Sequence, residues 1–241
     1  MLKNHSSLLQ KQKYLLPGIC CILQLAVLLQ GCRMQYPETD YTVEKFSLAE
    51  GKQMTLLVCG SCHYNEATKR FSGKKMDDVP GMIGSVYASN ITRHPEAATG
   101  KYTDAELARL IRTGVSRTGK WMPYMMRPNL SDEDLQNILA YLRSEDELVK
   151  PLAEKPGRTR YTPFGKIMLT RTKPLPYAGT RVAKPIQEVA LGKYLVDNLA
   201  CFHCHSKSIT SLDYLHPEKI QRIHGWGQLD EKRRWKTRPD T

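Results

Sequence analysis

Apolar side chains recur at helical spacing in two stretches of the chain, TDAELARLIRTGV (103–115) and SDEDLQNILAYLRSE (131–145). In the second, they stand at positions 135, 138, 139 and 142, the i, i+3, i+4, i+7 stripe of an amphipathic helix. Thr103 with Glu106 and Ser131 with Asp134 predict capping boxes at the two starts. SLAEGKQMTLLV (47–58) also begins with such a pair, Ser47 with Glu50, and predicts a third helix.

Gly- and Pro-rich loops join these helices, and no convincing strand pair stands between them. We therefore predict an all-α domain over residues 47–148. Residues 149–184 are rich in Pro, Gly and bases and are expected to form a linker. Beyond it, EVALGKYLVDNLACFHCH (188–205) echoes LAEGKQMTLLVCGSCH (48–63), which predicts an internal repeat and a partial second copy over 185–241.

The first 32 residues have the form of an export signal, with a basic start, an apolar run and the stretch LQGC. LQGC resembles the lipobox of bacterial lipoproteins, in which the Cys, here Cys32, is acylated. A lipoprotein, an uncleaved membrane anchor and a soluble exported protein remain open as alternatives. Each places the bulk of the chain outside the cytoplasm, on the periplasmic or cell-surface side, with 33–46 as a tether.

The chain is basic, with 36 Lys and Arg against 24 Asp and Glu. Such a surface favours acidic protein partners, anionic membranes or nucleic acid and does not choose among them by itself. For an exported protein we expect redox partner proteins and a membrane contact through Cys32, and no nucleic acid.

Four of the seven cysteines form two C-x-x-C-H motifs, CGSCH (59–63) and CFHCH (201–205). This is the attachment pattern of c-type haem, in which two thiols bind the porphyrin vinyl groups and the next His binds the iron. Cys59, Cys62 and His63 are the first predicted set, and Cys201, Cys204 and His205 are the second. A zinc site and a redox dithiol are the alternatives. Zinc ribbons space their two Cys pairs by roughly 15–20 residues, whereas these two pairs are more than a hundred residues apart, which disfavours a zinc site.

A six-coordinate haem needs a second axial ligand, and KWMPYMMRPN (120–129) offers Met122, Met125 and Met126 before the last predicted helix. A thioether is a soft neutral donor that favours ferrous iron. An isolated Met more often packs in a core, so the choice among the three stays open on these grounds.

The stretches YASNIT, YTDAELARLIRTGVSRTGK, MPY and LSDEDLQNILAYLRS make residues 47–148 similar to class I bacterial cytochrome c domains, notably those of the cytochrome subunits of alcohol dehydrogenases. The resemblance implies a cytochrome c fold carrying haem c, with Met122 as the distal ligand. It also implies that Arg112 contacts a haem propionate, against the alternative of a solvated charge at a helix end. Gly51 is expected to let the first helix approach the third near Tyr141.

The second copy has the first helix and the haem-attaching motif of such a domain without the part that follows them. No Met follows His205, and no second pair of helices follows in the sequence. His216 and His224 are the remaining candidate ligands, with exposed His side chains as the alternative. We expect a haem at this motif to be mobile and solvent-exposed, or the motif to be empty. Docking of this segment on the first domain through the linker, with His216 or His224 as a ligand, is the less favoured alternative.

These features predict an electron carrier rather than an enzyme, because no set of catalytic side chains stands out. Its donor would be a dehydrogenase or a quinol-oxidising complex, and its acceptor an oxidase or another cytochrome. The alternatives are a haem enzyme or sensor that uses an open second haem, and an anchoring subunit of a dehydrogenase complex.

Overall fold

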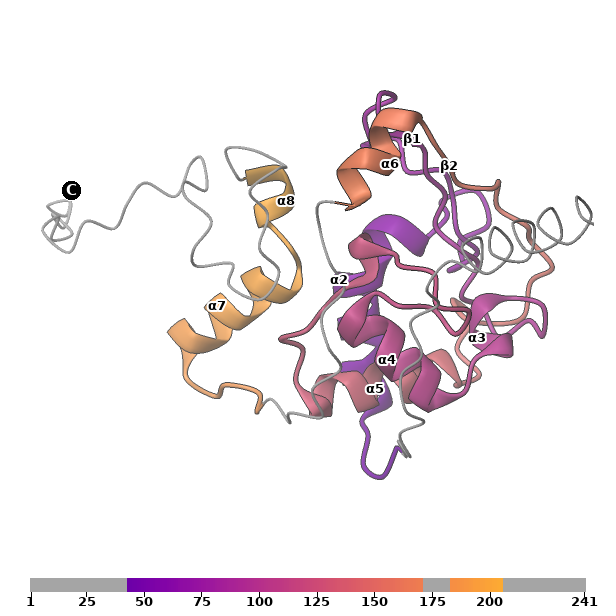
Figure 1. The fold of residues 1–241 in the computed structure, drawn as a ribbon. Coiled ribbons are helices and arrows are strands. Elements are labelled where there is room, and N and C mark those ends of the chain that lie inside the picture. Colours follow the sequence, from indigo (N-terminus) through magenta and orange to yellow (C-terminus); the bar gives the residue numbers. More distant parts are fainter. Residues whose placement is uncertain (1–42, 171–182, 206–241) are drawn as a thin grey trace, which may run out of the picture.

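The computed structural model describes residues 43–170 and 183–205. Three helices, α2, α4 and α5, form the centre of the molecule, and α7 and α8 lie beside them in Figure 1. This confirms the predicted mainly helical fold. The elements are α2 (Leu48–His63), β1 (Gly84–Ser85), α3 (Ala98–Lys101), α4 (Asp104–Thr113), the 3-10 helix η1 (Pro123–Met125), α5 (Asp132–Leu142), β2 (Arg160–Tyr161), α6 (Pro163–Thr170), α7 (Glu188–Asn198) and α8 (Phe202–His205).

Helices α2 and α5 cross at Gly51, as expected. A Cβ built on Gly51 would lie 2.2 Å from the Asn137 carbonyl oxygen and 2.8 Å from Tyr141 Cβ. The missing side chain therefore lets the two backbones touch. Tyr141 is fully buried there, and its hydroxyl donates to Asp146 Oδ1 over 2.8 Å. The buried core around this crossing is formed by Met54, Val58, Phe71, Leu107, Ile111, Leu130, Leu135, Ile138, Leu139, Leu142 and Val149.

Only one of the predicted capping boxes is complete. Thr103 and Glu106 make both hydrogen bonds of the motif at the start of α4. At α2, Ser47 Oγ accepts from Glu50 N, but the Glu50 carboxylate instead accepts from Asn137 Nδ2 over 3.0 Å. At α5, Ser131 Oγ accepts from Asp134 N over 3.0 Å. The Asp134 carboxylate is engaged with α7 and the residues before it.

A short strand pair joins a loop of the helical domain to the segment expected to be a linker. β1 and β2 pair antiparallel, with Gly84 opposite Tyr161 and Ser85 opposite Arg160. The pair ties the segment expected to be a linker back onto the helical domain, near α6 in Figure 1. Gly165 of α6 continues this contact, since a Cβ there would lie 2.0 Å from the Ile83 carbonyl oxygen.

The described part of the second copy packs on the first domain through α7. Tyr194 belongs to the same buried core as the central helices, and Leu191, Leu195 and Leu199 pack against that core. The Tyr194 hydroxyl donates to Asp134 Oδ2 over 2.6 Å, and Lys184 Nζ lies 2.9 Å from Asp134 Oδ1. Apolar burial and polar contacts together therefore hold α7 in place.

The second motif differs from the first in its backbone. In the first, α2 runs without a break from Leu48 through His63. In the second, α7 ends at Asn198, and Ala200 has φ 55°, in the left-handed region, before α8 begins. The second motif lies nine residues after its Gly192, one more than the spacing after Gly51. The left-handed turn absorbs this extra residue.

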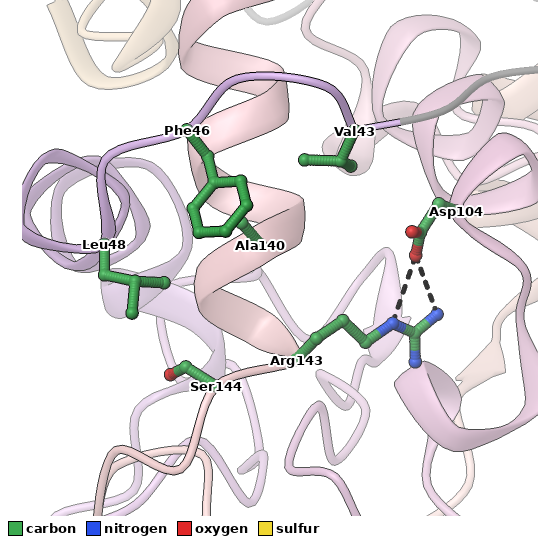
Figure 2. A pocket seen from close by; sticks show the side chains of 7 residues that line it. All are labelled: Val43, Phe46, Leu48, Asp104, Ala140, Arg143 and Ser144. Atoms are coloured by element: carbon green, nitrogen blue, oxygen red, sulfur yellow. Dashed lines mark hydrogen bonds and ion pairs between the residues drawn. The ribbon is translucent and has the colours of Figure 1, made fainter.

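A cavity of about 340 Å³ opens at the other end of α2, beside the last turn of α5. Figure 2 shows Phe46 and Leu48 on one side of it and the Arg143–Asp104 ion pair on the other. Leu48 is about 16 Å along the helix from Cys59, so this cavity is separate from the C-x-x-C-H motif. Among the described helices, none combines the length and apolar character needed to cross a membrane.

The crossing at Gly51 generates a matched pair of substitutions. Gly51→Ala should lower the free energy of unfolding by about 1–3 kcal/mol, because its methyl group would overlap the α5 backbone. Gly192→Ala, at the corresponding position of α7, meets nothing within 4 Å and should leave the stability unchanged or raise it by up to about 1 kcal/mol. Denaturant unfolding of both variants measures this, and equal effects would contradict the close crossing.

Candidate functional site

The last turns of α2 carry the first C-x-x-C-H motif. Cys59 and Cys62 are three residues apart on the helix, so their side chains lie on one face with His63 next to them. Both cysteines are half-buried free thiols. Free thiols are the groups that thioether attachment of a haem requires.

His63 is buried, with 5% of its surface exposed, and its Nδ1 lies 2.7 Å from the Ser89 carbonyl oxygen. A carbonyl only accepts, so Nδ1 carries the proton and Nε2 keeps its lone pair. Burial lowers the pKa of His63 and so favours the neutral ring, although the bond to Ser89 opposes this. A neutral, oriented imidazole with a free Nε2 is the form that binds iron.

The Ser89 carbonyl is itself held by its neighbours. The side chain of Asn90 donates to the carbonyl oxygens of Leu152 and Glu154 over 2.8 and 3.0 Å. A Cβ on Gly73, which has φ 79°, would come within 2.7 Å of the Ser89 carbonyl carbon. The stretch YASNIT therefore places the acceptor that orients His63. Sequence reasoning missed this acceptor because a backbone carbonyl leaves no mark in the residue types.

The charge of Arg127 reaches the motif from a loop more than sixty residues away. It acts on both Cys59 and His63, lowering the pKa of each. For Cys59 burial is the larger effect, so the pKa of the thiol is raised to about 12 in spite of Arg127. The thiol is partly exposed, but protein atoms surround it densely. Arg127 belongs to the loop between η1 and α5, and sequence reasoning did not single it out.

The segment that leads from α4 to this loop begins with a tight turn. Gly114 ends the helix with φ 73°, and its carbonyl accepts from Met122 N over 2.7 Å. A Cβ on Gly114 would lie 2.7 Å from the Met122 carbonyl oxygen, so glycine is needed both for its dihedral angle and for the space. The turn therefore brings the Met122 backbone against the end of α4.

The three candidate methionines differ in burial. Met126 is buried, with 4% of its surface exposed, whereas Met122 and Met125 are half-buried. Met126 therefore behaves as a core residue, and Met122 stays the predicted ligand.

Trp121 adds a polar group beside Met122 that the sequence did not single out. Its indole Nε1 is buried without a hydrogen-bond partner among the residues that the structure describes. A buried N–H of this kind calls for an acceptor. A carboxylate of a bound haem would be an acceptor of the right kind.

Arg112 is buried rather than solvated, so the alternative of a solvated charge at a helix end is wrong. Its guanidinium donates to the carbonyl oxygens of Pro128 and Leu130, and pairs with Asp132 Oδ1 over 2.6 Å. These contacts hold Pro128 and Leu130, in the loop of residues 122–131 that we call the methionine loop, on α4. A propionate contact of Arg112 stays a prediction.

The second motif is less enclosed than the first. His205 is exposed and Cys201 is half-buried. His205, unlike the buried His63, is therefore open to solvent within the described structure. His216 and His224 lie outside the described residues, as does Cys32.

The first site fits covalent haem, because it offers two free thiols and an oriented imidazole at the end of one helix. Fold and site together define a helical haem-attaching domain. Comparison with known proteins identifies its family: residues 48–146 match the cytochrome c family model, and this part of the chain is a cytochrome c domain. Such a domain binds haem c covalently, and Cys59 and Cys62 lie in its attachment motif.

Relatives of the chain are similar to it at modest identity. It is 31% identical over 157 residues to a nicotinate dehydrogenase subunit of Pseudomonas putida, in a match that covers 61% of this chain and 13% of that protein. It is 26% identical over 210 residues to the fructose dehydrogenase cytochrome subunit of Gluconobacter japonicus (80% and 42%). It is 30% identical over 161 residues to the cytochrome c subunit of the quinone alcohol dehydrogenase of Gluconacetobacter polyoxogenes (61% and 33%). The chain thus spans less than half the length of these relatives.

Substitution of the half-buried Met122 should change the haem spectrum, whereas substitution of the buried Met126 should change the stability. Met122→Ala should abolish the far-red absorption band of thioether-ligated ferric haem. Met126→Ala should keep the band and lower the stability by about 2–5 kcal/mol, because it removes a buried side chain. Met125→Ala should keep both. Visible spectra and thermal unfolding of the three variants test this, and a band lost in Met125→Ala or Met126→Ala would move the ligand there.

Proposed function

We propose that this chain is an electron carrier that works through haem c, as a cytochrome subunit of a dehydrogenase complex outside the cytoplasm. The observation that carries the proposal is the buried, neutral His63, which follows Cys59 and Cys62 at the end of α2. Haem c supplies a one-electron iron couple when bound. The chain's own residues would attach the porphyrin, orient its ligands and exclude water.

Each predicted ligand has a distinct part in this function. Cys59 and Cys62 would fix the porphyrin to α2, and the hydrogen bond of His63 to Ser89 would hold the imidazole in one tautomer and orientation. Met122 would supply a neutral thioether, which raises the reduction potential relative to a second imidazole. The nearby positive charge of Arg127 acts in the same direction, because it disfavours ferric iron.

A haem count with a redox titration tests this proposal. The purified exported chain should contain covalent haem and show a reversible one-electron transition. Cys59→Ala with Cys62→Ala should remove the thioether-ligated haem, whereas Cys201→Ala with Cys204→Ala should spare it. A protein that matures in a haem-attaching host without any covalent haem would overturn the proposal.

The relatives support a dehydrogenase as the electron donor, since each is named as a subunit of one. The net charge of +9 on the part of the chain after the export signal would speed docking on an acidic partner and make the association rate fall with salt. A quinol-oxidising complex as donor, and an oxidase or another cytochrome as acceptor, fit the same one-electron chemistry.

We further propose that Cys32 carries a lipid anchor on the periplasmic or cell-surface side of a bacterial membrane. The support is the sequence LQGC at the end of an export signal. Cys32→Ser should leave the protein unprocessed or release it from the membrane. Fractionation and mass measurement of the mature protein check this, and a mature, membrane-bound Cys32→Ser variant would show that the anchor lies elsewhere.

A second function, binding of small ligands at the second motif, is favoured by one observation. His205 is exposed, whereas His63 is buried. A haem attached to Cys201 and Cys204 would then have an open position on its iron. A high-spin component that disappears in Cys201→Ala with Cys204→Ala would support this function.

A further inference from the structure

The end of the methionine loop is held by a side chain from α7. Ser131, which caps α5, donates its backbone N–H to the Tyr194 hydroxyl over 2.9 Å. The same hydroxyl lies 3.1 Å from Ser131 Oγ and donates to Asp134 Oδ2 over 2.6 Å. All three residues are buried. The Tyr194 hydroxyl is therefore a hydrogen-bond partner for three buried polar atoms, Ser131 N, Ser131 Oγ and Asp134 Oδ2.

Two further contacts flank this hydroxyl. Asn198, one turn along α7, donates from Nδ2 to the Asn129 carbonyl oxygen over 3.4 Å. Lys184 pairs with the second oxygen of the buried Asp134 carboxylate over 2.9 Å. The segment 184–198 thus contacts residues 129–134 at three points.

The other anchors of the loop come from α4 and the turn that follows it. Met122 N donates to Gly114 O over 2.7 Å at the start of the loop, and Arg127 N donates to Ile111 O over 2.6 Å in its middle. Arg112 holds the carbonyl oxygens of Pro128 and Leu130. The start and the middle therefore rest on the first domain's own helix, whereas Ser131 N, at the end, is served by α7.

We propose that Tyr194 is a positioning residue for the distal side of the first haem, so that α7 completes the first haem domain. The inference rests on the proposed function, in which Met122 is the distal ligand. Without the hydroxyl, the buried Ser131 N–H and the Asp134 carboxylate each lose a partner, and such loss is relieved by opening the loop to water. A loop that opens more often releases its methionine more often.

The experiment follows replacement of the thioether by cyanide in the ferric full-length protein, read as loss of the far-red band. The measurement is made in a Cys201→Ala, Cys204→Ala background, in which the second attachment motif is removed, so that the band reports the haem at the first motif. Tyr194→Phe keeps the ring and removes only the hydroxyl. We expect about a tenfold faster replacement, the size of effect expected when one buried donor loses its partner.

Lys193→Ala is the matched control, because Lys193 is on the same helix, is exposed and pairs only with Asp197 among the ion pairs of the described residues. It should leave the rate unchanged. Asn198→Ala removes the weaker contact and should raise the rate about two- to threefold. It also provides the test if Tyr194→Phe fails to fold.

The outcomes separate the inference from the proposed function. An unchanged rate in a folded, haem-loaded Tyr194→Phe, or in Asn198→Ala if the former does not fold, overturns the inference alone. A wild-type protein that has covalent haem but lacks the far-red band overturns the assignment of Met122, and this inference with it. A rate raised equally in Lys193→Ala would show a general loosening of α7 and would also overturn the specific role of Tyr194.

Discussion

The close crossing of α2 and α5 at Gly51 is the contact on which the rest of the structure depends. α2 is a single helix of 16 residues, about 24 Å long, so fixing one end of it fixes the direction of the other. His63 lies at that far end and needs the Ser89 carbonyl within hydrogen-bonding distance. A methyl group at Gly51 would tilt the helix, and a small tilt at the crossing becomes a larger displacement at the haem-attaching end.

The polar groups at the helix starts reinforce the same arrangement. Glu50 and Asp134 each stand three residues after the residue that caps their helix, the position whose side chain completes a capping box. The carboxylate of each instead contacts another segment of the chain. Glu50 accepts from Asn137 of α5, and Asp134 accepts from Tyr194 of α7. Each helix gives up one local hydrogen bond and gains a contact with a distant part of the chain. Such a bond constrains the relative placement of two helices, which a local cap cannot do.

Sequence patterns predicted what local chemistry decides: the three central helices and their Ser and Thr caps. The close crossing at Gly51 was expected from the resemblance to class I cytochrome c domains. The patterns failed where the partner is distant or is backbone. The Ser89 acceptor has no side-chain signature, and the β1–β2 pair is too short for a period to be seen. The contacts of Arg112 with the carbonyl oxygens of Pro128 and Leu130 were not predicted either, because nothing local shows that this loop returns to α4. Tyr194 stood in a haem-motif helix, where its role toward the first domain has no local sign.

The docking of α7 also shows why one helix can serve two purposes. Tyr194 and Asn198 lie four residues apart on the face that meets the first domain, while Gly192 and Val189 lie on the opposite face. Val189 is 88% exposed, and a Cβ on Gly192 would meet nothing within 4 Å. In α2 the corresponding glycine is Gly51, and the face of α2 that carries Gly51 packs against α5. The contact with the first domain therefore leaves unused the face through which the first copy holds its own third helix, so holding the methionine loop and packing against such a helix do not compete for the same surface of α7.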